Sequence, residues 1–191
     1  MTEIILPMEK VKATCQSPKN LIIFSKPKTG KTELLAQLPN SILIDLEEGS
    51  DFVDAVKLKA RSIEEIHAIG KAILAQNKPY KYIIIDSLTA LEDMCIPYAE
   101  LLYSRKAIGK SWFKRDADGK LTSDSGKVQY GNILNLSQGG GYAFLREAIT
   151  KIVGFIETLA PRVIFSAHIK DVLLEKAGGE FNSADLDLTG N

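Results

Sequence analysis

The chain has 191 residues, of which 45% are hydrophobic and 25% charged, and 24 basic residues balance 24 acidic ones. This length suits one α/β domain with a sizeable core, and the composition is that of an ordinary globular protein. The zero net charge excludes a whole-molecule field that attracts nucleic acid, although a local patch is not excluded. No apolar run is long enough to span a bilayer, and the N-terminal MTEIILPMEK is not a secretory signal.

In chain order, the first expected element is a buried strand at 20–25 (NLIIFS), a β-branched apolar run that ends in a loop of Lys, Pro and Gly. A helix follows, with leucines at helical spacing and a proline at its end. A second buried strand at 41–46 ends in acids and a glycine. An amphipathic helix at 62–77 has isoleucines along one face, and Ser62 can cap it with Glu65 at the third position.

The second half of the chain continues this alternation. A third buried strand at 82–86 leads into a helix, and a long helix at 141–161 precedes a fourth strand at 162–171. Strands that alternate with helices predict a mostly parallel sheet covered on both faces. The whole chain, 1–191, is therefore expected to be a single α/β domain.

Two segments show no sustained period. Residues 105–141 are rich in Gly, Ser, Lys and Asp, and a loop this long inside a compact domain is usually functional or disordered. Residues 171–191 are predicted to be a second loop or tail.

The two cysteines, Cys15 and Cys95, form no CxxC motif or Cys/His cluster, so they are expected to be free thiols of a reducing compartment.

The stretch SKPKTGKT at 25–32 has the residues of a phosphate-binding loop between a strand and a helix. In such loops backbone N–H groups surround phosphate, a lysine reaches its outer oxygens, and a hydroxyl holds Mg²⁺. Lys31 and Thr32 fit these roles, and Gly30 allows close backbone approach. Ser25 replaces the usual first glycine, and it would cost on the order of 1 kcal/mol if φ were positive there. The alternative is a chance match in a lysine-rich turn.

Carboxylates follow two other expected strands. Asp86 ends the third strand, where a Walker B aspartate holds the water shell of magnesium, although it could instead cap the next helix. Many P-loop ATPases place a catalytic glutamate directly afterwards, but here that residue is Ser87. Glu47 and Glu48 follow the second strand and reach the same edge of the sheet. Thr32 and Asp86 are the expected magnesium ligands, and the expected nucleotide-binding residues are Ser25, Lys26, Pro27, Lys28, Thr29, Gly30, Lys31, Thr32 and Asp86.

Three stretches, LIDLEEGSD, YIIIDSLTAL and VIFSAHIKD, together resemble the core of RecA-type recombinases. With PKTGKT they look like the RecA-like ATPases of phages that are associated with single-strand annealing. The resemblance covers roughly residues 20–175. It implies a three-layer P-loop NTPase whose sensor strand lies between the P-loop strand and the Walker B strand. It also implies ATP and Mg²⁺ as cofactors, and it leaves room for further strands after residue 191.

The resemblance also implies roles for individual residues. Lys31, Glu47 and His168 are the expected catalytic residues, and Glu47 would orient the attacking water, with Glu48 as its rival. His168 matches a glutamine that senses the γ-phosphate, and the alternative is a satisfied core histidine. Lys170 is a second sensor, a residue that reaches a neighbouring subunit's nucleotide, or a solvated lysine.

The recombinase core carries DNA-binding loops at positions that correspond to 105–141 and 171–190. The first has seven basic against three acidic residues with interleaved aromatics, as binding of single-stranded DNA requires. The alternative is a solvated insertion whose aromatic side chains pack on the core. The second segment is mildly acidic, and its residues do not support DNA binding. The candidate DNA-binding residues are Lys110, Trp112, Phe113, Lys114, Arg115, Lys127 and Tyr130.

Together these features predict an ATP-dependent, phage-type protein that binds single-stranded DNA and acts in recombination or annealing. It is expected to work as a homo-oligomer, a ring or a filament, in the cytoplasm of the host cell, with DNA-stimulated hydrolysis. A single-strand-binding protein is a candidate partner, and no membrane partner is expected. Two alternatives stay open: a nucleotide-gated binding module without significant hydrolysis, and a small-molecule P-loop kinase, which would need arginines over the phosphates.

Overall fold

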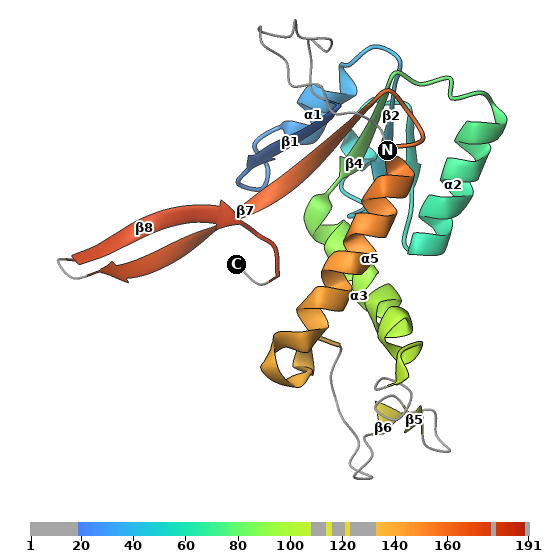
Figure 1. Ribbon diagram of the computed structural model, residues 1–191. Helices are drawn as coiled ribbons and strands as arrows, with labels where there is room; N and C mark the ends of the chain where they lie inside the picture. The colour runs from blue at the N-terminus through green and yellow to red at the C-terminus, as the bar shows by residue number, and fades with distance from the viewer. Residues whose placement is uncertain (1–18, 108–113, 116–120, 123–132, 177–178, 190–191) are drawn as a thin grey trace, which may run out of the picture.

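A parallel sheet with helices on both faces forms the centre of the computed structural model, shown in Figure 1. The structure describes residues 19–107, 114–115, 121–122, 133–176 and 179–189. The strands are β1 Asn20–Ser25, β2 Ser41–Asp45, β3 Lys57–Lys59, β4 Tyr82–Asp86, β5 Lys114–Arg115, β6 Leu121–Thr122, β7 Arg162–Lys176 and β8 Gly179–Leu186. The helices are α1 Lys31–Ala36, α2 Ile63–Ala75, α3 Leu88–Ser104 and α5 Gly140–Ile156, with 3-10 turns η1 Ser50–Phe52, η2 Ile133–Asn135 and η3 Ser137–Gly139.

The strand order of the main sheet is β1-β7-β4-β2-β3, and each neighbouring pair along it is parallel. The strand β7 therefore lies between β1, which leads into the phosphate-binding loop, and β4, which ends in Asp86. The predicted α/β fold, with a sensor strand between those two strands, is confirmed. Because the strands are parallel, their carboxyl ends meet at one edge of the sheet.

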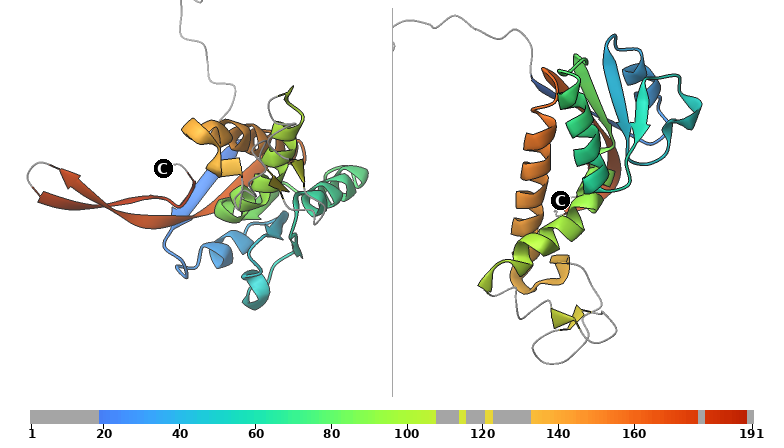
Figure 2. Two further views of the ribbon diagram at one scale, coloured as in Figure 1. Left: turned by 90° about the horizontal axis from the view of Figure 1, so that it is seen from below. Right: turned by 90° about the vertical axis from the view of Figure 1, so that its right-hand side faces the viewer.

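Successive side chains of these strands point to opposite faces of the sheet. Ile85 and Phe165 belong to a large buried cluster with α2, α3 and α5 on one face. On the other face Ile84 and Ile164 pack against Leu35 of α1. Figure 2 shows the resulting three layers, with α1 on the side opposite the longer helices.

The strand β1 lies at an edge of the sheet, and among the described elements only β7 pairs with it. Leu21 and Ile22 are each 44% exposed and Phe24 is 58% exposed. The prediction of a buried strand at 20–25 is therefore wrong, whereas all three isoleucines of β4 are fully buried. An apolar run indicates a strand but does not reveal whether it has one neighbour or two.

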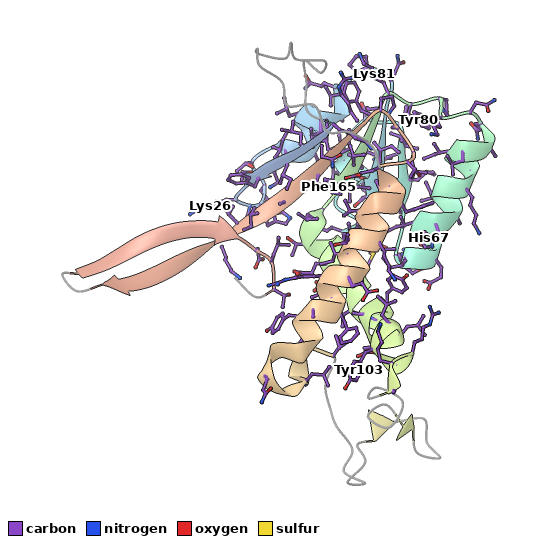
Figure 3. All side chains as sticks on the ribbon, viewed as in Figure 1. Lys26, His67, Tyr80, Lys81, Tyr103 and Phe165 are labelled. Atoms are coloured by element: carbon purple, nitrogen blue, oxygen red, sulfur yellow. The ribbon has the colours of Figure 1, made fainter. Side chains whose placement is uncertain are left out.

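The helix α2 begins as the sequence predicts. Ser62 Oγ accepts a hydrogen bond from Glu65 N at 3.2 Å, and Glu65 Oε2 accepts one from Arg61 N at 2.7 Å. Farther along α2 lies His67, which is labelled in Figure 3. Its ring packs edge-on against that of Phe155 of α5, with ring centroids 4.6 Å apart. Among the described helices, none is long and apolar enough to cross a bilayer.

The first predicted loop, 105–141, is shorter than its sequence boundaries. Ile133 is fully buried, and beside it Tyr103 of α3 packs edge-on against Phe144 of α5 with ring centroids 4.9 Å apart. The end of this segment therefore belongs to the core. Of the candidate DNA-binding residues, Lys114 and Arg115 are described only as the backbone of β5. Those outside the described residues are Lys110, Trp112, Phe113, Lys127 and Tyr130.

The second predicted loop, 171–191, is largely a β-hairpin. The strand β7 continues beyond the sheet to Lys176 and pairs antiparallel with β8, from Ile169 opposite Leu186 to Lys176 opposite Gly179. Figure 1 shows this hairpin projecting from the body of the molecule. The prediction of a loop or tail at 171–191 was wrong. The two strands of a hairpin satisfy each other's backbone hydrogen bonds, and this pairing does not require a periodic apolar pattern in the sequence.

Candidate nucleotide-binding site

The stretch 25–32 forms the loop between β1 and α1. Gly30 has a φ of 85°, a conformation that glycine adopts without steric penalty, and Lys28 has a φ of 62°. Ser25 is not among the residues with positive φ, so the strain considered for this position does not occur. Ser25 is instead the last residue of β1 and pairs in register with His168 of β7.

Lys31 folds back over this loop. Its Nζ donates to Ser25 Oγ at 3.1 Å, to Ser25 O at 3.3 Å and to Lys26 O at 3.2 Å, and the residue is only 9% exposed. Thr29 Oγ1 donates to Lys26 O at 3.0 Å and shares a hydrogen bond with Ser25 Oγ. The serine thus supplies a hydroxyl acceptor for the lysine, a contact that a glycine could not make.

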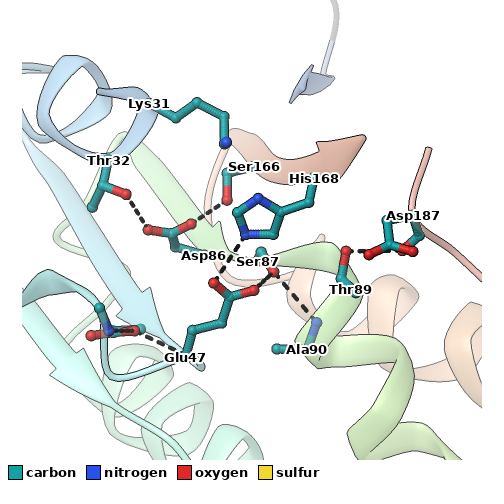
Figure 4. Close-up of polar contacts among 12 residues, drawn as sticks. Lys31, Thr32, Glu47, Asp86, Ser87, Thr89, Ala90, Ser166, His168 and Asp187 are labelled. Atoms are coloured by element: carbon teal, nitrogen blue, oxygen red, sulfur yellow. Dashed lines mark hydrogen bonds and ion pairs between the residues drawn. The ribbon is translucent and has the colours of Figure 1, made fainter. Parts of the chain in front are cut away.

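A second group of contacts joins three elements at Asp86, as Figure 4 shows. Asp86 Oδ2 accepts from Thr32 Oγ1 at 2.6 Å, and Asp86 Oδ1 accepts from Ser166 Oγ. Asp86 is 7% exposed and Ser166 is fully buried. A threonine hydroxyl beside a carboxylate offers the hard oxygen ligands that Mg²⁺ prefers, and this ion commonly completes its shell with water and phosphate. The donor set therefore fits Mg²⁺.

The turn after β2 separates the two candidate glutamates. Asp45 is 1% exposed and accepts from Glu47 N at 3.1 Å and from Ser50 N and Oγ at 3.0 and 2.5 Å. Burial by itself would raise the pKa of Asp45, but these hydrogen bonds outweigh it and lower that pKa. Glu47 then faces the pocket described below. Glu48, with a φ of 58°, pairs with Arg61 and does not line that pocket.

Glu47 contacts His168 of β7 and Ser87, the residue that follows β4. Its Oε2 lies 3.0 Å from His168 Nε2, and its Oε1 accepts from Ser87 Oγ (Figure 4). An ionised carboxylate only accepts hydrogen bonds, so with Glu47 ionised this contact is a hydrogen bond in the tautomer of His168 that has its proton on Nε2. His168 Nδ1 is buried and has no hydrogen-bond partner in the part of the chain that the structure describes. Ser87 also caps α3 by accepting from Ala90 N at 3.4 Å, so the helix cap is not Asp86.

These side chains surround one pocket of about 440 Å³. Its wall contains residues 27–32 together with Glu47, Asp86 and His168. The pocket lies at the carboxyl ends of β1, β2 and β4, beside His168 of β7, a strand that continues past this edge to Lys176. Parallel sheets collect their ligands at such an edge. Lys28 and Lys31 supply positive charge, so the arrangement suits a polyphosphate with a bound cation.

Lys170 lies outside this pocket. Its Nζ donates to Leu188 O at 3.2 Å and lies 3.9 Å from Asp187 Oδ1. Asp187 N donates to His168 O at 2.9 Å, and Thr89 Oγ1 donates to Asp187 O at 3.0 Å. Lys170 therefore helps to close the base of the β7–β8 hairpin, two residues after His168, which contacts Glu47.

A phosphate-binding loop between a strand and a helix, an aspartate at a neighbouring strand end and this strand order define the class of P-loop nucleoside triphosphatases. The chain belongs to the family described as AAA domain, whose model matches residues 17–185. Comparison with curated proteins gives no match. Membership of the family indicates a nucleotide-binding ATPase, and proteins of this class generally bind ATP and Mg²⁺.

Three polar contacts of the site were missed by sequence reasoning. They are the acceptor role of Asp45, the bond from Ser87 to Glu47 and the bond from Ser166 to Asp86. A signal was present for two of them, because Asp45 and Ser166 interrupt runs that were expected to be buried. A polar residue in such a run needs a hydrogen-bond partner. The sequence does not identify that partner.

Proposed function

We propose that this P-loop ATPase is a RecA-type protein that binds single-stranded DNA and acts in recombination or annealing. The observation that carries the proposal is the position of Glu47. It lies at the end of β2 and faces the phosphate pocket, while Ser87 occupies the position after Asp86. A carboxylate supplied by the neighbouring strand supports the RecA-type arrangement over one in which a glutamate follows the Walker B aspartate.

The chemistry follows from the contacts of the pocket. Lys31 would exchange its loop acceptors for phosphate oxygens, and Thr32 and Asp86 would hold Mg²⁺ and its water shell. The bound Mg²⁺ supplies positive charge that stabilises the charge developing on the phosphates. Glu47 would accept a hydrogen bond from the attacking water and so orient it. His168 and Ser87 each contact one oxygen of Glu47, and a carboxylate has about four acceptor sites, so the water can bond to Glu47 beside these two contacts.

Coupling to DNA is proposed to pass through β7. Ser166 contacts Asp86, and His168, two residues further on, faces Glu47. The same strand continues directly into the hairpin, whose base is closed by the bond from Asp187 N to His168 O. A shift of His168 toward a γ-phosphate would therefore act on the hairpin through the backbone. The basic and aromatic residues of 105–141 are proposed to supply the DNA contacts, on the strength of their composition alone.

We further propose that the protein acts as a homo-oligomer, a ring or a filament, in the cytoplasm of a phage-infected cell. A single-strand-binding protein is its proposed partner. Hydrolysis is expected to be slow until DNA or a neighbouring subunit completes the site. Static light scattering with and without Mg–ATP and single-stranded DNA measures the assembly directly.

The decisive experiment measures phosphate release with and without single-stranded DNA. We expect DNA to raise the rate for the wild type. Lys31→Ala and Glu47→Gln should lower it by about 10²-fold or more, because each removes a group that acts on the reacting phosphate or water. Glu48→Gln is the matched control, since Glu48 is bonded to Arg61 outside the pocket, and it should keep nearly the full rate. Fast, DNA-independent turnover by a stable monomer would rule the proposal out.

One alternative has an observation in its favour. Because Glu47 is hydrogen-bonded to both Ser87 and His168, the site could hold nucleotide without activating water, as a nucleotide-gated binding module. In that case phosphate release stays at background and Glu47→Ala alters neither nucleotide affinity nor DNA binding. The kinase alternative gains no support, since the cations in the described pocket wall are lysines and none is an arginine.

A further inference from the structure

A second hollow adjoins the phosphate pocket. It has a volume of about 260 Å³, and it is lined on one side by Glu33 and Ala36 of α1 and by Gln37, which follows that helix, and on the other by Phe52, Val53 and Asp54. Glu33 and Val53 also line the phosphate pocket. The two hollows therefore adjoin each other along the side of α1.

The side chain of Phe52 is fully exposed, at 102% of its reference area. A phenyl ring left in water is unfavourable, and a flat ligand that covers it gains affinity. Its backbone is well held at both ends of η1. Val53 N donates to Ser50 O at 3.0 Å, Lys57 Nζ donates to Val53 O at 2.8 Å, and Ser50 is bonded to Asp45. Because the turn is already ordered, a ligand need not spend binding energy on ordering it.

A triphosphate bound at the loop would extend toward this ring. Glu47 and His168 would flank the γ-phosphate, while Lys31 reaches the β- and γ-phosphates. The nucleoside must then leave at the other end of the chain. Glu33 follows the phosphate-binding residues on α1 and is shared by both hollows, so this exit opens between Glu33 and Val53.

We propose that the hollow between α1 and the η1 turn is the base-binding subsite, in which the nucleobase stacks on Phe52. The inference rests on the proposed nucleotide-binding function and adds to it the recognition of an aromatic base. Gln37 and Asp54 are polar residues in the lining of the hollow. A carboxylate accepts and cannot donate, so Asp54 suits a base that carries an exocyclic amino group, as adenine does.

The test compares ATP with inorganic tripolyphosphate, which has the same phosphate chain and no base. Isothermal titration calorimetry in Mg²⁺ measures both ligands on the wild type, Phe52→Ala, Phe52→Trp and Lys31→Ala. Stacking of one base on an aromatic side chain corresponds to about 5- to 150-fold in affinity. Phe52→Ala should lose ATP affinity by that factor and bind tripolyphosphate as the wild type does. Phe52→Trp should bind ATP at least as well as the wild type.

The controls distinguish a failure of the base-binding subsite from a failure of nucleotide binding as a whole. Lys31→Ala should weaken both ligands, because it removes a phosphate contact. Leu74→Ala, at a residue of α2 that is 38% exposed and lines neither hollow, should change neither ligand. If the wild type binds ATP and Phe52→Ala binds it within twofold, the subsite is overturned and the proposed function stands, whatever Phe52→Ala does to the oligomeric state. If the wild type binds neither ligand, both proposals fall.

Discussion

The strands β4 and β1 both end at the phosphate pocket, but their surroundings differ. The strand β4 lies between β2 and β7, and its isoleucines are fully buried. The strand β1 has β7 as its one neighbour among the described elements, and its apolar side chains are 44% to 58% exposed at Leu21, Ile22 and Phe24. Asp86 therefore ends a strand in the buried centre of the sheet, whereas the loop that leads to Lys31 follows a strand with an exposed side.

The difference extends to the hydrogen bonds at the two strand ends. Asp86 is held by hydroxyl groups from α1 and β7, which are separate elements of the fold. The loop after β1 is held largely by its own atoms, through the bonds among Ser25, Lys26, Thr29 and Lys31. The position of Asp86, on the side of the pocket that fits Mg²⁺, is therefore fixed by contacts with other elements. The phosphate-binding loop can instead exchange its internal hydrogen bonds for bonds to a ligand.

The largest expected effect tests whether the two strands differ in stability. Ile84→Ala in β4 removes a fully buried side chain and should lower the free energy of unfolding by about 2–5 kcal/mol. Ile22→Ala in β1, at a side chain that is 44% exposed, should cost clearly less because less apolar area returns to water. Urea unfolding of the two variants measures both values. Equal losses would show that β1 is covered in solution.

The next effect concerns the magnesium side of the pocket. Asp86→Asn keeps the shape of the side chain but removes the charge that would hold the magnesium shell. Phosphate release should fall by about 10²-fold or more and should respond less to added Mg²⁺. Circular dichroism serves as the control for folding, since Ser166 and Thr32 lose an ionised acceptor. A variant with normal turnover would remove Asp86 from the site.

A smaller effect is expected at Ser87, which positions Glu47 through a hydrogen bond. Ser87→Ala should lower kcat about tenfold and leave KM nearly unchanged, because a residue that only orients a catalytic group typically contributes about 10- to 100-fold. Ser87→Thr keeps the hydroxyl and should restore part of the rate. If the alanine variant raises KM with kcat intact, Ser87 acts on nucleotide binding instead.

The smallest effect is a pH dependence at Asp45. Its pKa is lowered from 3.8 in the folded state, so the ionised carboxylate stabilises the fold above that pH, and the contribution is lost as pH falls below it. Between about pH 5 and 3 the wild type should therefore lose stability more steeply than Asp45→Asn. Urea unfolding at a series of pH values measures the two slopes. Identical slopes would mean that the turn does not depend on this charge.

Much of the fold could be predicted because its central elements carry strong local signals. The isoleucine run before Asp86 and the capped helix after Ser62 both form where the sequence indicates. The short strand β3 and the hairpin of β7 and β8 were missed. The former has only three residues, too few for a period, and the latter is held by pairing between backbones rather than by a pattern of side chains.

For the site, the local sequence pattern predicted which residue types are present but not which partner each residue contacts. The two glutamates after β2 are equivalent in sequence, and they separate only because Asp45 folds the turn so that Glu47 faces the pocket while Glu48 pairs with Arg61. Likewise, nothing local indicates that Ser87 bonds to a residue 40 positions away. The exposed ring of Phe52 beside α1 is also visible only in three dimensions.

The amino-acid sequence by itself determined that this chain is an α/β protein with a phosphate-binding loop, because loop chemistry and strand patterns act over a few neighbouring residues. The tertiary structure alone decided that β1 has β7 as its one neighbour among the described strands, that Asp86 is held by two hydroxyls, and that Glu47 contacts His168. Those outcomes depend on which strands become neighbours. Strand pairing joins residues that are far apart in the chain, and the local sequence of one strand does not specify which strand will pair with it.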